Sequence, residues 1–131
     1  MNNTAIGTFD VTLTPQAAET ETTNPAVGRM KIDKRFYGDL DATAAGQMLT
    51  ALTAVEGSAS YSAIEQVSGT LHGRSGTFLL QHTGIMTRGE RSLTITVVPD
   101  SGTGELADIF GAMAITIDNA GHHYQFSYTL P

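Results

Sequence analysis

Apolar and polar side chains alternate with a period of two along most of the chain. Within residues 4–14, for example, Phe9, Val11 and Leu13 alternate with Thr and Asp. Because successive strand side chains point to opposite faces, this pattern predicts a strand with one apolar face. The same pattern, broken by turn residues, predicts eight strands, which span residues 4–14, 29–38, 43–53, 59–71, 76–86, 93–99, 113–118 and 122–130.

Three segments fit this pattern less well. Residues 43–53 could equally form a helix, since their apolar side chains also fit one helix face. Residues 103–110 predict a short helical turn with Thr103 as its N-cap and Gly111 as its end. Residues 15–27 are polar and predict an exposed, mobile connection.

Eight consecutive antiparallel strands with one apolar face each must stack as a sandwich or close as a barrel. Short sequential hairpins favour the barrel, which leaves no exposed edge. We therefore predict an all-β chain, with residues 1–131 forming one closed, antiparallel, eight-stranded up-and-down β-barrel. The interior of such a barrel is just filled by side chains or holds one small ligand.

Composition narrows the functional classes. The 131 residues suit one domain, and their net charge of −6 argues against nucleic-acid binding and against docking on anionic membranes. The chain has no cysteine, which excludes disulfides and zinc–thiolate sites. No signal-peptide region or membrane-spanning apolar run is evident, so we expect a cytoplasmic protein. We expect no cofactor, and a homo-oligomer through the outer faces is compatible with the pattern.

Three ionisable side chains fall on the apolar face of predicted strands. Lys34 shares its register with Phe36, His82 shares its register with Leu80, and Glu65 lies in the same way on residues 59–71. All three should therefore point into one interior. A buried charge is costly unless it has a partner, so the three side chains either pair with one another or await a ligand.

The hairpin of residues 59–86 predicts how two of them meet. If Leu71 faces Gly76 across a four-residue loop, Glu65 faces His82 directly. A slipped register would make Glu65 and His82 diagonal neighbours, still within contact range. Lys34, from a strand two removed, could reach them only across the interior.

Two tyrosines, Tyr61 and Tyr124, lie on the same inner face and could complete a polar network. The candidate ligand-binding residues are therefore Lys34, Glu65, His82, Tyr61 and Tyr124. No metal site is predicted, because the adjacent His122 and His123 point to opposite faces of a strand.

The polar residues admit several interpretations. Glu65 and His82 could form a satisfied structural pair, with the Lys34 head group snorkelling out of a barrel mouth. They could instead orient a small, mostly apolar ligand by its polar end. They could also act as a general acid–base pair in a cyclase- or isomerase-like enzyme. In a purely structural or interaction protein, the outer face would be the functional surface.

Several short motifs together resemble one known family. They are Phe36-x-Gly38-Asp39-Leu40, Gly57-Ser58-Ala59-x-Tyr61, Gly73-Arg74-x-Gly76-x-Phe78, Gln81-His82-x-Gly84 and Ser101-Gly102-Thr103-Gly104-Glu105-Leu106. The combination is similar to that of a family of small bacterial proteins known as domain of unknown function 3224. This resemblance implies a β-barrel like that of plant allene oxide cyclase. It carries no activity over to these residues.

Overall fold

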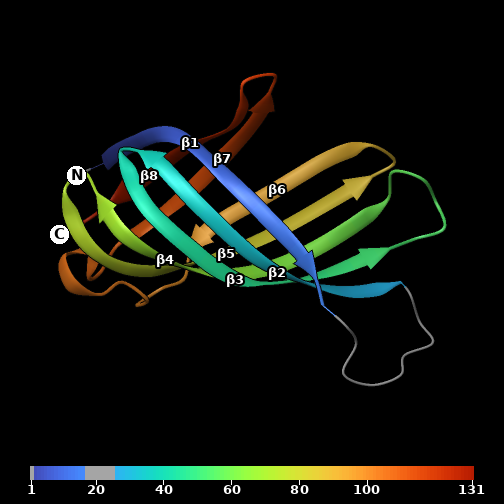
Figure 1. Cartoon of the computed structure of the whole chain (residues 1–131), viewed down its shortest axis with the longest axis horizontal. Coiled ribbons are helices and arrows are strands. Elements are labelled where there is room, and N and C mark those ends of the chain that lie inside the picture. The colour runs from blue at the N-terminus through green and yellow to red at the C-terminus, as the bar shows by residue number, and fades with distance from the viewer. Residues whose placement is uncertain (1, 17–25) are drawn as a thin grey trace.

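The computed structural model describes residues 2–16 and 26–131. Most of the predicted connection at residues 15–27 therefore lies outside the described residues. The structure contains eight strands and one 3₁₀ turn, η1 (Figure 1). The strands are β1 (Asn2–Pro15), β2 (Val27–Gly38), β3 (Leu40–Leu52), β4 (Ala59–Leu71), β5 (Arg74–Thr87), β6 (Glu90–Val97), β7 (Phe110–Asp118) and β8 (Gly121–Thr129), and η1 covers Gly104–Leu106.

The strands form one closed antiparallel barrel in chain order, which confirms the predicted fold class. Each strand pairs with the next one, and β8 pairs with β1 to close the sheet. Ala5 of β1, for example, lies opposite Phe126 of β8, and both side chains are buried in the interior. The period-two pattern thus identifies the inner faces of β1 and β8 correctly.

Two predicted segments differ from the structure. Residues 43–53 belong to the strand β3 and are not helical; β3 starts earlier, at Leu40, because the tight turn at Gly38 and Asp39 leaves no loop. The predicted helical turn is only η1, and Thr103 makes no side-chain cap to it. The Thr103 Oγ1 instead accepts a hydrogen bond from the Thr77 amide at 3.0 Å, which ties the connection to β5.

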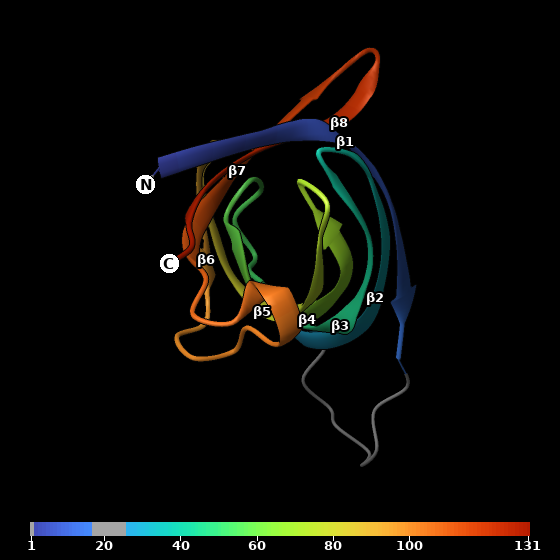
Figure 2. The ribbon, with the colours of Figure 1, turned by 90° about the vertical axis from the view of Figure 1, so that its left-hand side faces the viewer.

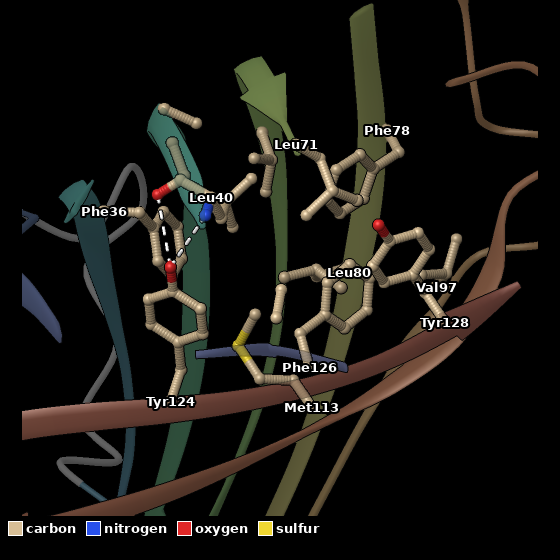
Figure 3. Close-up of a cluster of buried hydrophobic side chains, with 14 of the residues drawn as sticks. Phe36, Leu40, Leu71, Phe78, Leu80, Val97, Met113, Tyr124, Phe126 and Tyr128 are labelled. Atoms are coloured by element: carbon tan, nitrogen blue, oxygen red, sulfur yellow. Dashed lines mark hydrogen bonds between the residues drawn. The ribbon is translucent and has the colours of Figure 1, made fainter. Parts of the chain in front are cut away.

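One end of the barrel is densely filled, and we call it the packed end. It holds the β2–β3 and β4–β5 turns, and the connection that contains η1 lies across it (Figure 2). Aromatic and aliphatic side chains fill the interior here (Figure 3). Fully buried side chains among them are Phe36, Phe78, Phe126, Leu40, Leu71, Leu80, Leu106 and Ile109.

We call the opposite end, with the β3–β4, β5–β6 and β7–β8 turns, the splayed end. Within the described ranges, β6 and β7 pair only at Thr96 and Ala112, close to the packed end. The β7–β8 hairpin therefore diverges from the β5–β6 hairpin (Figure 1). Leu13, Leu93 and Ile117 continue the inward register of their strands here, yet they are 44%, 43% and 63% exposed. The inner face of the barrel is thus covered at one end and open to solvent at the other.

Candidate functional site

Lys34, Glu65 and His82 meet inside the barrel, and together they form what we call the polar cluster. The Lys34 Nζ lies 2.9 Å from the Glu65 Oε2 and donates a hydrogen bond to Oε1 at 3.2 Å. The His82 Nε2 lies 3.4 Å from the Glu65 Oε2 on the other side. The Lys34 side chain is only 7% exposed, so it does not snorkel to a barrel mouth as one interpretation held.

Small side chains on β3 make this meeting possible. Lys34 comes from β2 and Glu65 from β4, so β3 lies between them. The inward residues of β3 at this level are Ala44, which pairs with Lys34, and Gly46, which pairs with Glu65. A Cβ atom on Gly46 would lie 2.6 Å from the Glu65 Cα, closer than packing allows. The intervening strand therefore leaves room for the lysine chain to cross it.

The predicted pairing of Glu65 with His82 is wrong by one step of the register. Glu65 lies opposite Leu80, and His82 lies opposite Ala63. The reason is the turn, which has two residues instead of four: His72 and Gly73 both have left-handed backbones, with φ of +48° and +81°. That conformation is typical of a tight two-residue hairpin. Glu65 and His82 are consequently diagonal neighbours, the alternative that the sequence left open.

The surroundings of Glu65 favour its charged form. Burial raises the pKa of this carboxyl group, but the neighbouring His82 and the positive charge of Lys34 lower it more. The pKa of Glu65 therefore falls below its ordinary value of 4.5. The Lys34 ammonium in turn lies over the rings of Phe9 and Phe36, 5.2 Å and 5.8 Å from their centroids. Such contacts favour a cation, so the pair is an ion pair within an aromatic layer.

Two atoms of the cluster lack a well-formed hydrogen bond. In the part of the chain that the structure describes, the Glu65 Oε2 and the His82 Nε2 are buried and have no hydrogen-bond partner. Their mutual distance of 3.4 Å allows electrostatic attraction, but the geometry is not that of a hydrogen bond. Buried polar atoms are rarely left in this state. Of the two atoms, the Glu65 Oε2 is compensated by the Lys34 ammonium 2.9 Å away, whereas the His82 Nε2 has only the 3.4 Å approach to Glu65 among the described residues.

Tyr61 lies between the polar cluster and the splayed end. It stands on the inner face of β4, four residues closer to that end than Glu65, and its ring centroid is 6.4 Å from that of His82. The ring occupies the space over Gly84, where an added Cβ would lie 2.3 Å from a ring carbon. Burial and the charge of Glu65 raise the pKa of the Tyr61 hydroxyl. Tyr61 is half-buried and thus borders both the cluster and the open part of the interior.

Tyr124 belongs to the packed end instead. Its hydroxyl accepts a hydrogen bond from the Leu40 amide at 2.9 Å (Figure 3). It also donates one to the Tyr37 carbonyl at 2.9 Å. It therefore anchors the β2–β3 turn. The structure brings Tyr61 to the polar cluster but directs the Tyr124 hydroxyl away from it.

Other features of the surface lie apart from the cluster. A hollow of about 490 Å³ lies on the outer wall and is lined by Gln47, Ile64 and Gln81 among others, but by no cluster residue. Within the described residues no group of three His, Cys, Asp or Glu side chains could hold a metal ion. The rings of His122 and Phe9 pack together, with their centroids 5.0 Å apart.

No helix in the described ranges has the length and apolar character to cross a membrane.

Sequence reasoning missed the glycines that shape the site. Gly84 makes space for the Tyr61 ring, and Gly46 allows β3 to lie close to the backbone of β4 at Glu65. A glycine on the inner register next to a large or charged residue is a usable signal for such space.

The fold and the site together define the class: a closed eight-stranded β-barrel with an ion cluster in its interior. The chain belongs to the family described as "Protein of unknown function (DUF3224)", whose family model matches residues 5–128. This confirms the family resemblance of the sequence motifs.

A solved structure supports the same assignment. One similar protein of known structure is a protein of unknown function from the DUF3224 family of Shewanella oneidensis MR-1. Its sequence is 51% identical to this chain, and its crystal structure superposes on this structure with a TM-score of 0.92. The match covers 100% of this chain and 98% of that one. No curated protein matches the chain.

Proposed function

We propose that the barrel binds a small, mostly apolar molecule with one polar end, which enters at the splayed end. The observation that carries this proposal is the exposure of Leu13, Leu93 and Ile117, which are inward-facing residues. Inward residues of the same strands that lie nearer the packed end, such as Phe9 on β1 and Ile95 on β6, are buried. An apolar inner face that is exposed to solvent can bind another molecule that removes it from water.

The energetics favour such cover. Removing apolar surface from water stabilises a complex by about 25 cal/mol for each Å². Half-buried methionines, namely Met30, Met48 and Met86, lie on the inner register near the same end. Methionine is flexible and polarisable, so it adapts to ligands of different shape. The splayed end therefore offers contacts to an aliphatic or aromatic body.

Tyr61 and the polar cluster beneath it give the ligand a direction. A ligand that enters from the splayed end meets the half-buried Tyr61 before it meets Glu65 and His82. Apolar binding sites commonly use a few such polar groups to orient a ligand. We therefore place the polar end of the ligand at the Tyr61 hydroxyl.

The test uses a neutral apolar fluorophore, N-phenyl-1-naphthylamine, as the probe. Substitution of the inward Ile117 or Leu93 by Ser should weaken probe binding by about tenfold, since each removes apolar contact area. The matched controls are Ile64→Ser and Ile85→Ser on the outer face, where the side chains are 51% and 50% exposed. These controls should leave binding unchanged.

All four substituted side chains are substantially exposed, so each variant should fold. Absence of probe binding to the native protein would overturn the proposal. Equal losses in the inward and outward variants would also overturn it, because they would locate the probe on the outer wall.

A further inference from the structure

The charge of Lys34 is already compensated. Its Nζ is within 3.2 Å of both oxygens of Glu65, and its other neighbours are the faces of Phe9 and Phe36. The ammonium is thus enclosed by one carboxylate and two aromatic rings. A second carboxylate could not approach Lys34 without also approaching Glu65.

The order of residues along β4 places a ligand that enters from the splayed end and reaches Tyr61 on the same inner face as Glu65. Tyr61 and Glu65 are four residues apart on the same inner face, and the charge of Glu65 already acts on the Tyr61 hydroxyl. An anionic group beside Tyr61 would experience the same charge. Like charges in a partly buried site repel strongly, because solvent screens them poorly.

The Tyr61 hydroxyl can bind a neutral partner, since it can donate a hydrogen bond to a ligand oxygen. It can also accept one from a hydroxyl group. An alcohol or a carbonyl compound satisfies this group without adding a charge next to Glu65.

Arg91 is a cation on the inner register of β6 at the splayed end that a carboxylate could meet. It lies next to the β5–β6 turn, pairs with Met86, and is exposed. Exposed ion pairs contribute little to binding because water and salt screen them. Arg91 therefore does not offset the repulsion inside the barrel.

We infer that the polar end of the ligand is an uncharged oxygen, a hydroxyl or a carbonyl, and not a carboxylate. The inference rests on the proposed binding at the splayed end and specifies the chemical class of the ligand. The occupants that fit are apolar alcohols, aldehydes and ketones.

The experiment compares 1-decanol with decanoate as competitors of N-phenyl-1-naphthylamine. The two chains have the same length, so the head group alone differs. At about pH 8, where the acid is ionised, decanol should bind at least about tenfold more tightly than decanoate. As the pH falls to about 4.5, the acid takes up a proton and its affinity should approach that of decanol.

The variant Glu65→Gln removes the negative charge of the polar cluster and leaves the positive charge of Lys34. With Glu65 neutral, Lys34 would be an uncompensated cation, and decanoate should gain at least about tenfold in affinity relative to decanol. An Arg91→Gln variant should leave the decanol preference unchanged. If Glu65→Gln does not fold, the pH series on the native protein still decides.

The outcomes separate the two proposals. Decanoate binding as tightly as decanol, or more tightly, at about pH 8 would overturn this inference and leave the binding function standing. Failure of both compounds and of the probe to bind would overturn the proposed function itself. A decanoate affinity that does not change in folded Glu65→Gln would also contradict the inference.

Discussion

Lys34 and Glu65 form an ion pair across a strand that lies between them. Their charged atoms are 2.9 Å apart, although one residue is on β2 and the other on β4. Both side chains are almost fully buried, at 7% and 0% exposure. Each charge is therefore tolerated only because the other is present.

The first prediction concerns this mutual dependence. Lys34→Met leaves the Glu65 carboxylate buried without its cation and should lower the free energy of unfolding by about 3–5 kcal/mol. Glu65→Leu should cost a similar amount, because the ammonium is then uncompensated. The double variant removes both charges and should be more stable than either single variant. Urea unfolding of all four proteins at neutral pH measures the coupling.

An exposed pair of the same type provides the control. Lys31 and Asp33 lie 3.6 Å apart on the surface of β2, with side chains 58% and 50% exposed. The equivalent cycle, with Lys31→Met and Asp33→Leu, should give a coupling of at most about 1 kcal/mol. Additive losses in the buried cycle would show that the Lys34–Glu65 attraction contributes nothing to folding.

The second prediction is an acid dependence of stability that arises from Glu65. Its pKa in the folded protein lies below the ordinary value of 4.5, so acid favours the unfolded chain, which binds the proton more readily. The stabilisation is complete above about pH 4.5 and is lost as the pH falls through the lower folded-state pKa. The difference in unfolding free energy between native protein and Glu65→Gln should shrink over that window.

Urea midpoints measured from neutral pH down to about pH 3 would show this change. Glu56→Gln, in the exposed β3–β4 turn, is the matched control for removal of a carboxyl group. A constant difference for Glu65→Gln would mean that the carboxyl group titrates alike in the folded and unfolded states.

The sequence predicts the barrel because the inner register repeats over eight strands. In β4, the buried residues Ala63, Glu65 and Val67 alternate with exposed residues. This alternation of inward and outward positions, which we call parity, is a property of one strand and does not depend on the strand beside it. Parity therefore places Lys34, Glu65 and His82 in the interior. It does not decide how far one strand slides along the next.

Register depends on turn conformation, which alternation does not encode. His72 adopts a left-handed backbone that Asn or Gly adopts more readily, so a wider loop was the natural expectation. The splayed end was also outside the reach of sequence reasoning. The separation of β6 from β7 beyond Thr96 depends on tertiary packing, and residues such as Leu93 and Ile117 continue the buried register without interruption.

The third prediction concerns His72 as a tie between turns. Its amide donates a hydrogen bond to the Asp39 carbonyl at 2.9 Å, its Nε2 lies 3.6 Å from the Asp39 Oδ2, and its Nδ1 contacts the Tyr128 hydroxyl. His72→Asn keeps a residue suited to the left-handed backbone but loses the side-chain contacts. It should lower the free energy of unfolding by about 1 kcal/mol. His72→Ala should cost about 1 kcal/mol more, because alanine tolerates that backbone less well.

The β5–β6 turn provides the matched control. Arg88 has φ of +47° before Gly89, where His72 has +48° before Gly73, but among the described residues its side chain makes no hydrogen bond or ion pair. Arg88→Asn should therefore be neutral or slightly stabilising in urea unfolding, whereas Arg88→Ala should show only the backbone cost. If His72→Asn behaves like Arg88→Asn, the contacts to Asp39 and Tyr128 do not stabilise the fold.

The fourth prediction concerns the space that Gly84 leaves for Tyr61. A Cβ at Gly84 would lie 2.3 Å from the Tyr61 ring, so Gly84→Ala must displace the ring from its place beside His82. Overpacking of this kind costs about 1–3 kcal/mol.

In the Tyr61→Leu background the same substitution should cost much less, because the ring that it displaces is gone. Gly28→Ala is the control, since among the described residues its Cβ would meet only the movable Thr50 hydroxyl, at 2.8 Å. Urea unfolding measures these costs, and the chemical shifts of the Tyr61 ring report its displacement directly. An unchanged ring signal together with equal costs in both backgrounds would show that Gly84 does not position Tyr61. Because Tyr61 is the group to which we assign the ligand oxygen, Gly84→Ala should also weaken decanol binding.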